Sequence, residues 1–227
     1  MRKFNPSVLY IIDLDYPFAS SVLHWLAQTI VIMEVSMELF GFRKFDELLA
    51  FHCSPVLMRV KPANMIALPQ ANTETIMELI QEYNKQFASE GIIFRRLCCC
   101  SKRCLLLIYN EKELRLLLQD KGCRAYLTAA GYSIGNSLED DLLTLEQRLQ
   151  QDCNFPHEIG LFLGYPLEDV LGFVLNKGSN CKYSGYWKVY GDVEQARKLF
   201  NTYEKCRDFV LQRLTEGLPL YNAVTIG

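Results

Sequence analysis

Residues 92–109 have the sequence IIFRRLCCCSKRCLLLIY, and this stretch decides the class of fold. It holds two runs of strand-forming residues, Ile92–Cys99 and Cys104–Tyr109, joined by the short polar link Ser101-Lys102-Arg103. Two such runs with a short polar link are typical of a β-hairpin, whose strands are antiparallel. The sequence therefore predicts a small antiparallel sheet built on this hairpin. A further strand is predicted at Tyr186–Tyr190 (YWKVY), where apolar and polar residues alternate.

The segments around the hairpin have helical periodicity and helix-capping residues. Residues 54–70 are the exception, because three prolines there favour an extended or turning connector over a regular helix. The predicted fold is α+β, with many helices packed on a small, mostly antiparallel sheet of three strands or slightly more. The predicted helices cover residues 18–39, 44–52, 73–90, 110–118, 122–130, 138–149, 156–164, 166–176 and 192–216.

Charge and cysteine content exclude several classes of protein. The chain has 24 Lys and Arg against 26 Asp and Glu, a net charge of −2, so it lacks the basic surface expected of a protein that binds duplex nucleic acid. It also lacks the polybasic stretch that binds a membrane surface. Its nine cysteines are odd in number and lie in a chain rich in apolar residues. We therefore expect reduced thiols and a cytoplasmic location.

The N-terminal segment differs from the rest of the chain. Residues 18–37 are apolar, but His24, Gln28 and Glu34 interrupt them, so we expect no membrane span. We predict two parts: an N-terminal helical extension over residues 1–40, and a single α+β domain over residues 41–227. The extension is a candidate for contact with a protein partner or for self-association.

Motifs of common enzymes are absent: the chain has no G-x-G-x-x-G, P-loop, H-E-x-x-H or G-x-S-x-G sequence. Clustered cysteines are the most visible local feature, and Cys98, Cys100 and Cys104 are weak candidates for metal ligands. Their spacing is not that of paired CxxC motifs, so small buried residues are the alternative. No cofactor follows from the sequence.

Two neighbouring pairs of residues are candidates for catalysis. Cys53 is a candidate nucleophile and His157 a candidate acid or base, provided that the fold brings them together. Glu158 is a candidate partner that orients His157. The alternative is structural, with both residues at the N-terminus of a short helix. Whether the protein is an enzyme stays open. Separately, Lys61, Lys188 and Tyr190 are candidates for an anionic-ligand pocket.

Longer stretches support a family resemblance. FPHEIGLFLGYPLEDVLGF followed by GYWKVYGD, together with LLAFHCSPVLMRVKPANM and CLLLIYNEKEL, resembles an uncharacterised bacterial domain-of-unknown-function family, DUF3793-like, over roughly residues 45–227. The family often has a Cys-x-Cys-x-x-Cys-Trp stretch near the last strand, of which only Cys181 remains here. The resemblance implies an intracellular protein and assigns no activity. It marks as motif positions His52, Cys53, Lys61, Asn64, His157, Glu158, Asp169, Trp187, Lys188 and Tyr190.

Three segments carry these polar residues amid apolar ones: residues 52–64, 156–169 and 187–190. We therefore expect a protein that binds or acts on a small molecule in a pocket between them, with His52, Lys61, Asn64, Asp169, Trp187, Lys188 and Tyr190 as binding residues. Two alternatives stay open: a thiol-based redox or metal-handling accessory protein, and a non-catalytic protein-interaction module.

Overall fold

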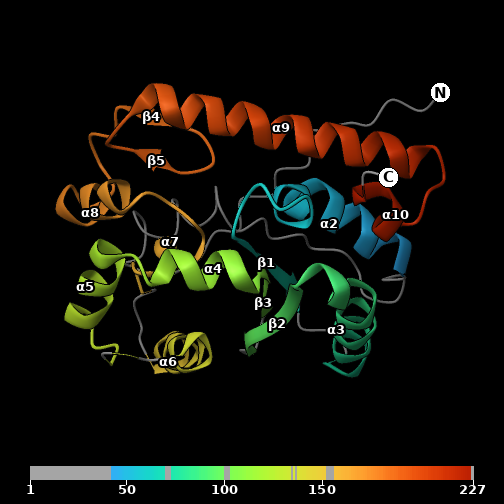
Figure 1. The fold of residues 1–227 in the computed structure, drawn as a ribbon, viewed down its shortest axis with the longest axis horizontal. Coiled ribbons are helices and arrows are strands. Elements are labelled where there is room, and N and C mark those ends of the chain that lie inside the picture. Colours follow the sequence, from blue (N-terminus) through green and yellow to red (C-terminus); the bar gives the residue numbers. More distant parts are fainter. Residues whose placement is uncertain are drawn as a thin grey trace.

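A computed structural model describes residues 42–69, 73–99, 103–133, 135, 137–151 and 156–225. The predicted helix over residues 18–39 and the metal candidate Cys100 lie outside these ranges. In the described part, a three-stranded antiparallel sheet is surrounded by helices, which confirms the predicted α+β class (Figure 1).

The main sheet has strand order β1-β3-β2 and is antiparallel throughout. Strands β2 (Ile92–Cys99) and β3 (Arg103–Asn110) form the predicted hairpin. The third strand, β1 (Ala63–Pro69), pairs with β3 on its other side. A separate two-stranded ribbon contains β4 (Tyr183–Ser184) and β5 (Lys188–Val189). The strand predicted over residues 186–190 is thus shorter and does not join the main sheet.

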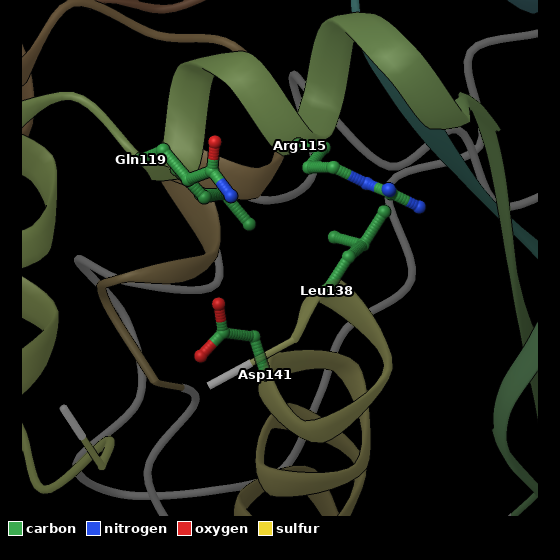
Figure 2. Close-up of a pocket in the computed structure, with 5 residues that line it drawn as sticks. Arg115, Gln119, Leu138 and Asp141 are labelled. Atoms are coloured by element: carbon green, nitrogen blue, oxygen red, sulfur yellow. The ribbon is translucent and has the colours of Figure 1, made fainter. Parts of the chain in front are cut away.

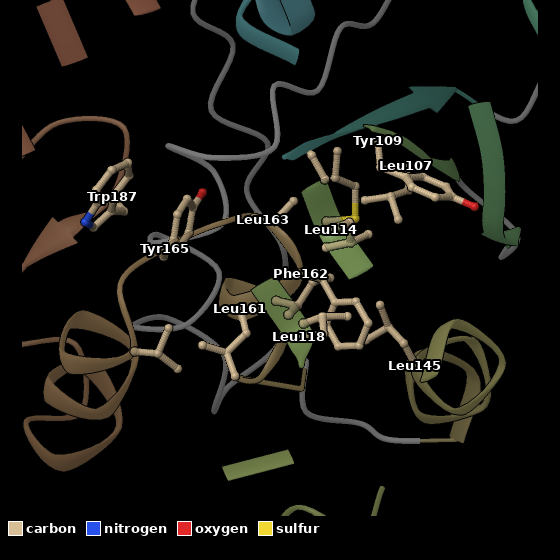
Figure 3. Packing of buried hydrophobic residues seen from close by; sticks show 14 of the residues in the cluster. Leu107, Tyr109, Leu114, Leu118, Leu145, Leu161, Phe162, Leu163, Tyr165 and Trp187 are labelled. Atoms are coloured by element: carbon tan, nitrogen blue, oxygen red, sulfur yellow. The ribbon is translucent and has the colours of Figure 1, made fainter. Parts of the chain in front are cut away.

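Helices cover both faces of the main sheet, because both faces of its strands are apolar. On β3, Leu105 and Leu107 belong to one buried cluster, whereas Leu106 and Ile108 belong to a second one. Helices α4 to α8, the ribbon and the first half of α9 complete the first cluster, part of which is drawn in Figure 3. Helices α2, α3 and α10 and the second half of α9 complete the second cluster. The helices are α2 (Phe42–Leu57), α3 (Thr73–Phe87), the 3-10 turn η2 (Ala88–Glu90), α4 (Glu111–Leu118), α5 (Lys121–Ala129), α6 (Leu138–Gln151), α7 (Ile159–Phe162), α8 (Leu167–Leu175), α9 (Val193–Thr215) and α10 (Leu220–Val224).

Helix α9 connects the two halves of the molecule. In Figure 1 it runs along the top, with the ribbon near its first turns and α2 and α10 near its last turns. Its N-terminal half contributes Phe200 and Tyr203 to the first cluster, and its C-terminal half contributes Val210 to the second. Among the side chains of α9, those near its middle therefore lie where one cluster gives way to the other.

Local capping signals locate several helix ends. The Asn110 side chain accepts a hydrogen bond from the Glu113 backbone N–H at 3.0 Å, and Asp192 accepts one from Gln195 at 3.0 Å. Helices were predicted to begin at these two residues, and the side-chain bonds show how each one caps its helix. Gly91, at the end of η2, has a φ of 66°, in the left-handed region that glycine adopts without strain.

The predicted connector over residues 54–70 is wrong in two ways. Helix α2 continues to Leu57 with Pro55 inside it, and β1 follows at Ala63. Burial is the physical reason: Val56 is fully buried, as are Ala63 and Ile66 in the strand. Pro55 cannot donate a backbone hydrogen bond, and this loss falls within the last turn of the helix. The free energy gained by burying apolar surface outweighs the free energy lost with that hydrogen bond.

Within the part of the chain that the structure describes, no helix combines the length and the apolar character needed to cross a membrane.

Candidate functional site

A tight turn at the end of α2 sets the direction of Lys61. The backbone N–H groups of Arg59 and Val60 donate to the carbonyls of Val56 and Pro55 at 2.9 and 2.7 Å. These bonds form a Schellman motif, in which the residue after the helix adopts a left-handed conformation. Arg59 has that conformation, with a φ of 60°, at a position where glycine is usual. The chain thereby reverses into β1 within a few residues.

Lys61 is buried although it carries an amine. Its side chain lies inside the protein, with the residue 4% exposed. The Nζ atom donates a hydrogen bond to Asn64 Oδ1 at 2.8 Å. The same atom lies 5.5 Å from the ring centre of Tyr165 and 5.9 Å from that of Tyr203. One amide oxygen and two aromatic faces therefore surround the amine, and both faces favour a cation.

Asn64 connects the amine to helix α2. Its Nδ2 atom donates to the backbone carbonyl of His52 at 2.6 Å and lies 4.0 Å from Cys53 Sγ. These contacts fix the orientation of the amide, because Nδ2 must face α2 and Oδ1 must face Lys61. Asn64 is itself buried. The sequence marked His52, Cys53, Lys61 and Asn64 together, and the structure places them around one amide group.

The charge of Lys61 has no opposite charge beside it among the residues that the structure describes. Among the described residues, no carboxylate forms an ion pair with Nζ. Burial lowers the pKa of Lys61 to about 8, against a smaller opposing effect of Cys53. Burial raises the pKa of the Cys53 thiol to about 12, against smaller effects of Asn64 and Lys61. The thiol is therefore neutral at pH 7 and does not supply the missing negative charge.

A close contact between two turns brings Tyr165 to Lys61. Gly164 has a φ of 77°, and a Cβ atom built on it would lie 2.4 Å from Cγ of Pro62. Glycine is thus required here for two reasons, the backbone conformation and the space. The following residue, Tyr165, stacks on Trp187 with ring centres 4.9 Å apart, and Figure 3 shows these two side chains next to each other.

Asp169 and Trp187 have structural partners. Trp187 Nε1 donates to Asp169 Oδ2 at 2.7 Å. The backbone N–H groups of Tyr190 and Gly191 donate to Asp169 Oδ1 at 2.7 and 2.8 Å. The carboxylate thus joins α8 to the chain that leaves β5, and both oxygens are used. The role of Asp169 and Trp187 in ligand binding stays a prediction; in the structure, their contacts support Tyr165, which stacks on Trp187.

Lys188 and Tyr190 form hydrogen bonds to a nearby turn. Lys188 Nζ donates to the Gly178 carbonyl at 2.7 Å, and Tyr190 Oη donates to the Ser179 carbonyl at 3.0 Å. Both side chains were predicted to line an anionic-ligand pocket. The structure uses them to hold the loop between α8 and β4.

The structure does not bring Cys53 and His157 together. Cys53 belongs to the second buried cluster, whereas the His157 ring packs on Phe173 of the first, with ring centres 5.6 Å apart. Burial lowers the pKa of His157, although the charge of Glu158 opposes this, and its buried Nδ1 atom has no hydrogen-bond partner among the described residues. Glu158 accepts hydrogen bonds from Arg148 Nε and, at 3.4 Å, from Tyr132 Oη. Glu158 is therefore held by α6 and is not directed at the His157 ring.

Family comparison agrees with the resemblance in the sequence. Residues 49–224 match the model of a family described as "Protein of unknown function (DUF3793)". The chain belongs to this family. Comparison with curated proteins and with solved structures finds no match. The DUF3793 match includes every residue described above around Lys61.

In this DUF3793 protein, Arg207 of α9 and His52 of α2 lie on either side of the Phe51 ring. The Arg207 guanidinium lies 5.4 Å from the ring centre of Phe51, which in turn contacts the His52 ring at 4.7 Å. Burial and the nearby Arg207 lower the pKa of His52 to about 4. Asp208 accepts one of the five guanidinium donors of Arg207, at 3.1 Å.

Sequence analysis did not identify Tyr165, Tyr203 or Arg207 as site residues. Tyr203 was assigned to the buried stripe of the last helix, and it is indeed buried. The available signal was spacing, since Tyr203 and Arg207 are four residues apart and so share a face of α9. Nothing local indicated that this face meets Lys61.

Of the cysteine candidates, the two that the structure describes, Cys98 and Cys104, do not come together. Cys98 packs against the first cluster and Cys104 belongs to the second, so they lie on opposite faces of the sheet. Within the described ranges, no group of three or more metal-binding side chains comes together.

A small surface pocket lies elsewhere, between α4 and α6. Figure 2 shows Arg115 of α4 and Gln119, which directly follows α4, facing Leu138 and Asp141 of α6. Its volume is about 10 Å³, room for roughly one water molecule. The Asp141 carboxylate is already paired with Arg124 at 2.5 Å. This pocket is too small for a metabolite, so we place the candidate site at Lys61.

Proposed function

We propose that this protein binds a small molecule whose anionic oxygen group pairs with the ammonium of Lys61. One observation carries the proposal: a buried amine stands among two aromatic faces and one amide, with no carboxylate paired to it in the described part of the chain. Buried charges in proteins are normally paired. An unpaired one in a closed environment is a candidate for ligand recognition.

Stability alone does not explain a lysine at this position. Methionine has a similar length and no charge, and it would fill the space without the desolvation penalty. Proteins retain strained or unfavourable groups chiefly where function requires them. Two neighbouring motif residues support this contrast. Asp169 accepts three hydrogen bonds and Glu158 pairs with Arg148, whereas no carboxylate of the described residues pairs with Lys61.

The seam between α2 and α9 is the proposed route to Lys61. Arg207 and His52 lie along this seam. The Tyr186 ring contacts the Tyr203 ring with centres 5.3 Å apart, and Tyr203 in turn contacts Nζ of Lys61. The positive charge of Arg207 attracts an anion, whereas His52, with its pKa lowered to about 4, is neutral. Side chains close the seam in this structure, so ligand entry in this proposal includes their movement.

The proposal also includes a cytoplasmic location and a single domain over residues 41–227. The cysteines Cys53, Cys123 and Cys206 are free and buried. They support the proposed location, because thiols stay reduced in the cytoplasm. The thiol-based alternative is not favoured at Cys53, because burial raises the pKa of that thiol and makes it a poor nucleophile.

A thermal-shift experiment tests the binding proposal. Purified protein in reducing buffer is melted with inorganic phosphate, acetate, oxalate or pyruvate, one at a time. An anion present at one hundred times its Kd stabilises the fold by about 2.7 kcal/mol. For a chain of this size, Tm then rises by about 5 to 10 °C.

The Lys61→Met variant should lose this rise in Tm. Lys198→Met is the matched control, because Lys198 is exposed on α9, and it should keep the rise. If no anion in the panel raises Tm, or if Lys61→Met responds as the unmodified protein does, the proposal is wrong.

A further inference from the structure

We propose that Lys61 condenses with a small aldehyde or ketone that carries a carboxylate, and so holds its ligand as an imine. This inference rests on the proposed function and names the substrate class of the same site. It requires that the amine be a nucleophile, that it be held in one direction, and that the product fit the same surroundings.

The surroundings of Lys61 favour a nucleophilic amine. A carboxylate beside Nζ would keep the nitrogen protonated and its lone pair unavailable, and no such pair forms in the described ranges. Desolvation in an apolar environment is a recognised way to activate lysine. Since burial lowers the pKa of Lys61 to about 8, a substantial fraction is the free amine at slightly alkaline pH.

One hydrogen bond directs the nitrogen. Nζ donates to Asn64 Oδ1 at 2.8 Å, and Asn64 is itself fixed by the His52 carbonyl at 2.6 Å. In the part of the chain that the structure describes, this is a single acceptor, so the remaining positions of the nitrogen are left for an incoming carbonyl carbon. The amine is therefore oriented without being saturated.

The reaction balances without any other reagent. The Nζ lone pair attacks the carbonyl carbon, the carbonyl π electrons move to oxygen, and one Nζ proton passes to that oxygen to give a carbinolamine. The nitrogen lone pair then forms the C=N bond as the C–O bond breaks, and the hydroxyl takes a proton from the solvent and leaves as water. One amine, one carbonyl compound and one proton thus give one protonated imine, which keeps one N–H, and one water, and nothing is oxidised or reduced.

The product suits the same surroundings. A protonated imine carries a positive charge and one N–H, so it keeps the hydrogen bond to Asn64 Oδ1 and the faces of Tyr165 and Tyr203. The carboxylate of the ligand supplies the missing negative charge, and the guanidinium of Arg207, between α2 and α9, is a further cation that favours it. A carbonyl compound without a carboxylate would leave that charge unmatched.

Reductive trapping tests the imine directly. The full chain is incubated with pyruvate and sodium cyanoborohydride at pH 8, and peptides are mapped by mass spectrometry over time. Burial gives Lys61 roughly one hundred times the free-base fraction of an ordinary lysine at this pH. We expect the pyruvate adduct at Lys61 to form at least about tenfold faster than at exposed lysines such as Lys198. Lactate in place of pyruvate should give no adduct.

The comparison uses the unmodified protein, so it does not depend on a variant that folds. If pyruvate raises Tm in a Lys61-dependent way but leaves no adduct at Lys61, the imine is wrong and anion binding stands. If Lys61 reacts no faster than Lys198, the imine is also overturned. If no anion of the panel raises Tm and no adduct forms, both proposals fail.

Discussion

Replacing Lys61 with methionine is expected to change the stability of the fold in a pH-dependent way. Burial lowers the lysine pKa from 10.5 to about 8, which corresponds to about 3 kcal/mol of destabilisation when the amine is charged in the folded state. Methionine removes this penalty but leaves Asn64 Oδ1 without its donor, at a cost of about 1 to 2 kcal/mol. At pH 7 the variant should therefore be more stable by about 1 to 2 kcal/mol.

The sign of the pH effect follows from proton binding. Below pH 8 both folded and unfolded chains hold the lysine proton, so the penalty is complete. Between pH 8 and 10.5 the unfolded chain holds the proton more tightly, so the stability of the unmodified protein gains relative to the variant. The advantage of Lys61→Met should shrink by about 2 kcal/mol between pH 7 and 9.5.

Urea unfolding at both pH values, in reducing buffer, measures this difference. Titration of other groups, such as Cys53, affects both proteins and largely cancels in the comparison. Lys198→Met is the control, and its stability relative to the unmodified protein should not depend on pH in this window. Equal pH slopes for Lys61→Met and the unmodified protein would refute the interpretation of Lys61 as a buried, unpaired cation.

Three further predictions concern Asp169 and Gly164, which support Tyr165, and the thiol of Cys53. Asp169→Ala removes the acceptor of three hydrogen bonds and should lower the free energy of unfolding by about 3 to 5 kcal/mol in urea titrations, with a changed Trp187 fluorescence; an effect below about 1 kcal/mol would contradict its role. Gly164→Ala should cost about 2 to 4 kcal/mol, because it combines a left-handed φ with a collision with the turn before β1. Gly91→Ala has a similar φ but open space, so it should cost only about 1 to 2 kcal/mol, and equal losses would disprove the collision. Iodoacetamide should leave Cys53 unmodified in the native protein, since the thiol is buried and its pKa is raised to about 12; rapid labelling monitored by mass spectrometry would contradict this.

Local features of the fold were predictable from the sequence. The hairpin β2–β3 follows from two apolar runs with a short link, and the caps at Asn110 and Asp192 follow from side chains that bond their own helix. Such signals lie within a few residues. The strand β1 was missed because prolines flank it and its pairing with β3 is set by burial between distant segments.

The candidate site was predictable only in part. Polar residues at 52–64 pointed to the segment in which we place the candidate site, and Lys61 was among the candidates. Tyr165 and Tyr203 come from distant parts of the chain, and only tertiary packing brings their rings to Nζ. Residue type also could not distinguish the surroundings of Lys61 from those of Asp169, because both are charged residues. In the described part of the chain, the carboxylate of Asp169 accepts several hydrogen bonds, whereas no carboxylate pairs with Lys61.

The most direct test of the central claim is the pKa of Lys61 itself, with and without an anion. Protein carrying ¹³C- and ¹⁵N-labelled lysine is titrated by NMR, and the Lys61 signal is assigned by its absence in Lys61→Met. We predict a midpoint near 8 that rises when phosphate, acetate, oxalate or pyruvate binds, because an anion beside the amine favours its charged form. An ordinary lysine midpoint, or a midpoint that none of these anions moves, would contradict the account.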